Sequence, residues 1–171
     1  MTIIRHTQSG SILQVQYTQF TTTNTMSVSA HTEAIFTDLT VNITPFKANS
    51  IIKLHCVLYG EFSNSSYTAN GMLYFLRNST KLGHTESAGI RRTGISSPVD
   101  NYVAPNAAST PESGVLTYFD SAHNSTSQIT YKLALDTYYA GTYYINRTVT
   151  DTNSNEYERG VSIISATEIA P

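Results

Sequence analysis

Apolar and polar residues alternate with a period of two along most of this 171-residue chain. Val, Ile, Thr and aromatic residues fill nearly every alternating segment. Apolar residues do not recur at the three- and four-residue spacing of a helix for more than one turn. Successive side chains of a strand point to opposite faces, so this pattern is typical of half-buried strands. It predicts an all-β fold: eight to ten strands in an antiparallel, jelly-roll-like β-sandwich with no substantial helix.

The alternating segments differ in the faces that they are expected to bury. Residues 51–59 are apolar on nearly both faces, which predicts a strand in the middle of a sheet. In an earlier segment, Leu13, Val15 and Tyr17 lie on one face, and we expect this apolar face to point into the core. The polar cluster Arg77–Lys81 lies between two alternating segments and predicts the clearest hairpin of the chain.

Hydroxyl and amide side chains are far more common here than charged ones. The chain has 25 Thr, 20 Ser and 12 Asn, a third of its residues, whereas charged residues make up only 13%. We expect these polar residues to form the outward half of the strands and the turns between them. With ten Lys and Arg and a net charge of −2, no nucleic-acid partner is expected, because phosphate backbones are bound by clustered cations. No membrane partner is expected either, since no stretch approaches the ~18 apolar residues of a span.

The length predicts one domain. A short N-terminal arm, residues 1–10, is expected to precede a single sandwich domain over residues 11–171. The start of the chain lacks the apolar run of a signal peptide, which favours synthesis in the cytoplasm. Residues 95–112 contain three prolines and no alternation, so they are predicted to form a long irregular loop. A loop of this length is often functional, which makes it a candidate contact surface.

No catalytic motif is found in the sequence. The five histidines show no metal-site spacing, and the chain has no nucleophile elbow, no glycine-rich phosphate loop and no paired-carboxylate motif. The single cysteine, Cys56, lies in the most apolar segment and is expected to be a small buried residue. We therefore expect neither enzymatic activity nor a cofactor.

One loop offers oxygen ligands at the spacing of a metal site. Asp151, Asn153 and Asn155 stand at positions one, three and five, as at the opening of a calcium-binding loop. Glu156 occupies the sixth position, where the sharp turn needs glycine, and Ser162 occupies the twelfth, where a bidentate glutamate is needed. A polar hairpin loop is therefore the favoured interpretation, and calcium binding is the weaker alternative.

Four of the 12 tyrosines lie between positions 138 and 144. Alternation places Tyr143 and Ile145 on one face of a strand, expected to be core, and Tyr144 on the other. For the tyrosines outside the core, ordinary sheet packing, a subunit interface and stacking against a glycan all remain open. The candidate interface or glycan contacts are Tyr102, Tyr138, Tyr139, Tyr144 and Tyr157.

Five strand motifs extend over nearly the whole chain, from about residue 10 to residue 170. They are Asp38–Pro45 (DLTVNITP), Phe75–Gly83 (FLRNSTKLG), Thr130–Lys132 (TYK), Tyr144–Arg147 (YINR) and Ser162–Ile169 (SIISATEI). In these motifs the chain resembles a domain that is widespread in tail-fibre and other virion surface proteins of tailed bacteriophages, particularly aquatic ones. The resemblance implies a β-sandwich exposed on the virion, commonly in trimers, and carries over no catalytic or ligand-binding residue.

The resemblance sets two alternatives for function. Tail-fibre domains of this kind normally end a longer chain, whereas only Met1–Ser9 precede the first expected strand. This favours a capsid decoration (cement) protein or a separately encoded fibre tip, assembled as a homotrimer that binds capsid or tail proteins. The alternative is a receptor-binding module that recognises a glycan on the host surface. In both cases the protein is expected in the virion, after synthesis in the host cytoplasm.

Overall fold

The computed structural model describes residues 8–63, 70–86, 88–98, 109 and 111–171. These residues contain ten strands and no helix, which confirms the all-β fold that the alternation predicts. None of them forms a helix that could cross a membrane. The strands are β1 (Ile12–Phe20), β2 (Asn24–Val28), β3 (Ala34–Ile43), β4 (Ile51–Phe62), β5 (Gly71–Arg77), β6 (Thr80–Leu82), β7 (Glu112–Asp120), β8 (Ile129–Thr137), β9 (Gly141–Ile145) and β10 (Ser162–Ile169).

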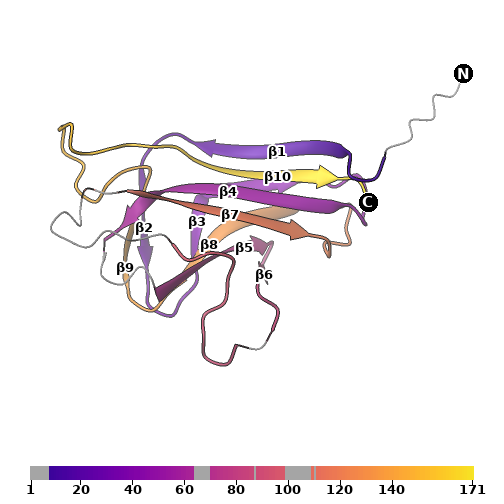
Figure 1. Ribbon diagram of the computed structural model, residues 1–171, viewed down its shortest axis with the longest axis horizontal. Helices are drawn as coiled ribbons and strands as arrows, with labels where there is room; N and C mark the ends of the chain where they lie inside the picture. Colours follow the sequence, from indigo (N-terminus) through magenta and orange to yellow (C-terminus); the bar gives the residue numbers. More distant parts are fainter. Residues whose placement is uncertain (1–7, 64–69, 87, 99–108, 110) are drawn as a thin grey trace, which may run out of the picture.

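The strands form two antiparallel sheets that pack against each other as a β-sandwich (Figure 1). The six-stranded sheet has the order β1-β10-β4-β9-β2, and β7 pairs with β4 as well. Because Gly60 of β4 pairs with both β7 and β9, these two strands lie on opposite edges of β4. The four-stranded sheet has the order β3-β8-β5-β6. The position of β4 inside the larger sheet confirms the prediction from its two apolar faces.

The core lies between the two sheets, where the inward residues of β4 and β10 face those of β3, β5 and β8. Its largest fully buried side chains include Phe36, Leu39, Ile43, Ile52, Leu54, Leu58, Leu73, Phe75, Leu116 and Tyr131. Cys56 is fully buried among them, and burial raises the pKa of its thiol, so the thiol stays protonated. Tyr143 and Ile145 are buried on the face that the alternation assigns to the core.

The predicted hairpin is formed by β5 and β6. Arg77 pairs with Thr80 across the turn, and Asn78 adopts a φ of 55°. This left-handed conformation suits asparagine in a tight β-turn. The Asn78 side chain also accepts a hydrogen bond from the Thr130 N–H at 3.0 Å, which ties the turn to β8.

The orientation of β1 differs from the expectation. Val15 and Tyr17 point outward and are 50% and 66% exposed, so the prediction that this face enters the core is wrong. The inward side of β1 is polar except for Phe20, which packs against the core: Gln14 Nε2 donates to Glu168 Oε2 at 2.7 Å, and Thr18 Oγ1 donates to the Thr40 carbonyl at 2.6 Å. Pairing with β10 sets this orientation, because partners across an antiparallel ladder share a face.

The arm and the long loop lie only partly within the described residues. At the N-terminal end, the Gly10 N–H donates to the Ala170 carbonyl at 3.0 Å. At the start of the loop, Ser96 forms an antiparallel bridge with Leu73, and β7 begins at Glu112. Residues 1–7, 99–108 and 110 lie outside the described residues.

Candidate interaction surfaces

The outer face of the six-stranded sheet carries an apolar surface, which we call the sheet face. Register places its side chains in rows across β1, β10, β4 and β7. The rows are Ile12–Ile169–Ile51, Val15–Thr167–Lys53–Phe119, Tyr17–Ser165–His55–Thr117 and Gln19–Ile163–Val57–Val115. In Figure 1 these four strands lie together along one side of the sandwich.

Several large apolar side chains of the sheet face are open to solvent. Ile12, Val15, Tyr17, Val115 and Phe119 are each at least half exposed. Lys53 is the only charged side chain in the four rows, and its ammonium group lies 5.9 Å from the centre of the Phe119 ring. Exposed apolar residues are common singly, but neighbouring strands that expose them together are typical of a surface that contacts a partner.

A second surface lies at the opposite side of the sandwich, where β8 ends. Tyr138 is 48% exposed, and its ring makes edge contacts with the rings of His31 and Tyr139 at 4.8 and 4.7 Å. The guanidinium of Arg92 lies 5.3 Å from the centre of the Tyr138 ring. Arg92 also forms an ion pair with Asp136 at 3.2 Å and approaches His31 Nδ1 at 2.6 Å. We call His31, Arg91, Arg92, Met72 and Tyr138 the loop site.

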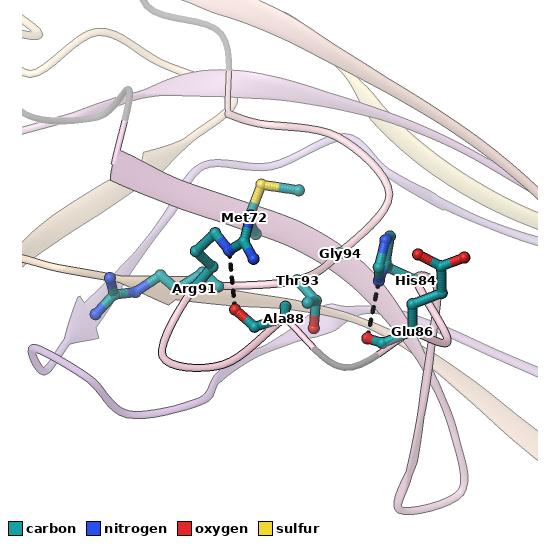
Figure 2. Close-up of a pocket in the computed structure, with 8 residues that line it drawn as sticks. Met72, His84, Glu86, Ala88, Arg91, Thr93 and Gly94 are labelled. Atoms are coloured by element: carbon teal, nitrogen blue, oxygen red, sulfur yellow. Dashed lines mark hydrogen bonds between the residues drawn. The ribbon is translucent and has the colours of Figure 1, made fainter.

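Two adjoining hollows of about 270 and 360 Å³ open beside this cluster. Both are lined by Met72, Arg91 and Arg92. Figure 2 shows Arg91 on one side of the first hollow and His84 and Glu86 on the other. The Arg91 Nε donates to the Ala88 carbonyl at 2.9 Å, and its other guanidinium nitrogens form no ion pair with any described residue.

The structure brings together only some of the predicted tyrosine contacts. Tyr138 belongs to the loop site, and the ring of Tyr139 contacts it. Tyr144 is half-buried elsewhere, with the Arg147 guanidinium 4.5 Å from its ring centre, and Tyr157 lines a different hollow. Tyr102 lies outside the described residues.

In the loop that was the weaker candidate for calcium binding, arginine side chains contact Asp151. Both carboxylate oxygens of Asp151 accept hydrogen bonds from Arg159, at 3.0 and 2.8 Å, and the Arg147 guanidinium lies 3.7 Å away. The hydrogen bond from Arg159 lowers the pKa of Asp151. Asn153 lines the same hollow as Asp151, and Asn155 is exposed. Among the described residues, no group of three or more His, Cys, Asp or Glu is arranged so that it could hold a metal ion.

A serine, a histidine and a glutamate meet inside the sandwich, but not as a catalytic triad. Ser50 Oγ donates to Glu168 Oε1 at 2.7 Å and lies 3.3 Å from His123 Nε2, so the serine stands between the other two residues. In a triad the histidine stands between them. Ser50 and Glu168 are fully buried, and Glu168 also accepts the N–H groups of Phe46 and Lys47. This cluster ties the β3–β4 turn to β10.

Sequence reasoning missed the arginines of the loop site. Arg91 and Arg92 are the only adjacent pair of basic residues among the ten Lys and Arg of the chain, and this was the available signal. The contacts of Arg92 with residues 31, 136 and 138 depend on the fold and could not be inferred from spacing.

No protein-family model matches this chain, and a search of curated proteins finds no match either.

Proposed function

We propose that this protein is a non-enzymatic structural protein exposed on a bacteriophage virion, as a capsid decoration (cement) or fibre-tip protein assembled as a homotrimer. The strand motifs that resemble virion surface domains support the setting. The observation that carries the proposal is the exposed, nearly uncharged sheet face. Its partners are other copies of this chain and capsid or tail proteins.

The flat area of the sheet face approaches that of a standard protein contact. Four strands about 4.8 Å apart and about nine residues long, at ~3.3 Å per residue, present roughly 570 Å² before side-chain relief is added. A standard protein interface buries about 800 Å² per partner. Full burial of one Val, Ile or Phe side chain contributes about 1.5–3 kcal/mol. Four such side chains, Ile12, Val15, Val115 and Phe119, are at least half exposed on this face together with Tyr17, and their burial favours association.

The polarity of the surfaces fits assembly on a particle. The sheet face has one charged residue in its rows, so a contact made through it changes little with ionic strength. A closed three-fold assembly covers this face on every subunit, so the face no longer recruits further copies. The Ser-, Thr- and Asn-rich remainder keeps the assembled surface hydrated.

Sedimentation equilibrium of the purified protein tests the assembly. The proposal expects a mass of about three times 18.8 kDa at micromolar concentration. A mass of one chain under these conditions contradicts self-assembly of the free protein. Gold-labelled antibody against this chain tests the setting: labelled capsids or fibre tips support the proposal, and unlabelled particles contradict it.

A further inference from the structure

The loop site has an aromatic platform in a fixed orientation. The Tyr138 N–H donates to the Asn70 carbonyl at 3.2 Å, and edge contacts with His31 and Tyr139 hold the ring. Tyr138 nevertheless remains 48% exposed. A half-exposed tyrosine combines an apolar ring face with a polar hydroxyl, which suits the alternating C–H and O–H groups of a sugar ring.

Planar polar groups line the two hollows, and Tyr138 is not itself among the lining residues. The Ala88 carbonyl holds the Arg91 Nε, which leaves the terminal guanidinium nitrogens as donors. Arg92 and Asn70 connect the hollows to Tyr138, because each lines a hollow and contacts that residue. Glu86 and Thr93 add acceptors and a hydroxyl to the first hollow.

The charges of the loop site nearly cancel. Arg92 is compensated by Asp136, with which it forms an ion pair. Arg91 faces a hollow that Glu86 also lines. Glu33 accepts a hydrogen bond from the hydroxyl of Tyr74, and the Lys81 ammonium group lies over the ring of the same tyrosine, so these two charges also offset each other. A set of directional donors and acceptors with little net charge suits hydroxyl groups better than a carboxylate or phosphate.

We propose that the loop site binds a neutral saccharide, with a sugar ring stacked on Tyr138 and its hydroxyl groups bonded by Arg91. Hollows of about 270 and 360 Å³ lie at the lower end of the range for small-ligand sites, which suits one or two sugar rings. The loop after β6, which carries the two arginines, lies on the side of the sandwich away from β1 and β10 (Figure 1). The site therefore stays open when the sheet face is covered.

Amide NMR titrations of the isotope-labelled full chain test this inference. The probes are the methyl glycosides of glucose, galactose, mannose and N-acetylglucosamine, with glucuronate as the anionic comparison. We expect at least one neutral glycoside, at concentrations up to ~50 mM, to give saturable shifts at the amides of residues 91–93 and 138, since a single sugar in an open site binds in the millimolar range.

Variants locate the binding. Tyr138→Ala and Arg91→Gln should each weaken it about tenfold, and Tyr138→Phe, which keeps the ring, should retain most of it. Both altered side chains are exposed, so the variants should keep the wild-type spectrum elsewhere. Tyr17→Ala on the sheet face and Arg159→Gln in the loop after β9 are the matched controls and should bind like wild type.

Three results overturn the inference: no saturable shift at these amides with any neutral glycoside, a response to glucuronate alone, or equal loss of binding in the control variants. None of these results bears on the oligomeric mass, so the saccharide site and the proposed assembly can fail separately.

Discussion

The two outer faces of this sandwich differ in how far their apolar side chains are covered by the rest of the chain. On the four-stranded sheet, outward apolar side chains are covered within the chain: Tyr74, Leu76 and Ala134 are buried, Ile95 packs against them, and the Lys81 ammonium lies 3.9 Å from the Tyr74 ring centre. On the six-stranded sheet, the outward apolar side chains of β1 and β7 are at least half exposed, and those of β4 and β10 are half-buried. A chain that covers one such face and leaves the other open has a surface that a partner can complete.

One tyrosine from each face illustrates this difference in coverage. Tyr74 is 2% exposed and donates its hydroxyl to Glu33 at 2.9 Å, whereas Tyr17 is 66% exposed. Tyr74→Ala should lower the free energy of unfolding by about 3–5 kcal/mol, because it removes a buried ring. Tyr17→Ala should change the free energy of unfolding of the single chain by less than about 0.5 kcal/mol.

Urea denaturation of both variants, under conditions where the protein is a single chain, provides the measurement. Equal losses in the free energy of unfolding for the two variants would contradict this difference between the faces.

Substitution of Glu168 tests whether its hydrogen bonds hold β1 in the orientation that exposes the sheet face. Burial raises the pKa of Glu168, but the hydrogen bonds from Gln14, Phe46, Ser50 and Lys47 together outweigh it, and the pKa lies below the ordinary value of 4.5. A carboxylate with a lowered pKa in the folded state stabilises the fold fully above pH 4.5. This contribution is lost as the pH falls below 4.5 through the pKa of the folded state.

Glu168→Gln should therefore lower stability at pH 7 by about 1–3 kcal/mol and flatten the fall in stability below pH 4.5. Thermal unfolding of wild type and variant across this pH range is the measurement, with the exposed Glu86→Gln as the matched control. If the stability of Glu168→Gln falls as steeply in acid as that of wild type, other carboxylates cause the acid-induced loss of stability.

The smallest effect is expected at the Asp151 loop. Because Arg159 already bonds both oxygens of Asp151, calcium would have to displace a guanidinium. Millimolar calcium should therefore leave the thermal unfolding midpoint unchanged. A rise that disappears in Asp151→Asn would restore the calcium interpretation of this loop.

The sequence predicts this fold well because alternation is a local property. The strand at residues 51–59, the hairpin at Arg77–Lys81 and the buried Cys56 all follow from neighbouring residues. The orientation of β1 does not, because it depends on which residues of β10 pair with it and on a buried carboxylate 154 positions from Gln14. The loop site is likewise assembled from positions that are distant in the sequence. The adjacent pair Arg91 and Arg92 was the only sequence signal for it.

Sedimentation of charged variants of the sheet face gives the most direct test of its role. Val15→Glu places a carboxylate on the apolar surface, and Ile90→Glu places the same charge on a fully exposed residue of the loop after β6. We predict that wild type and Ile90→Glu sediment at about three times 18.8 kDa, whereas Val15→Glu sediments as a single folded chain. Equal masses for Val15→Glu and wild type would contradict an assembly made through this face.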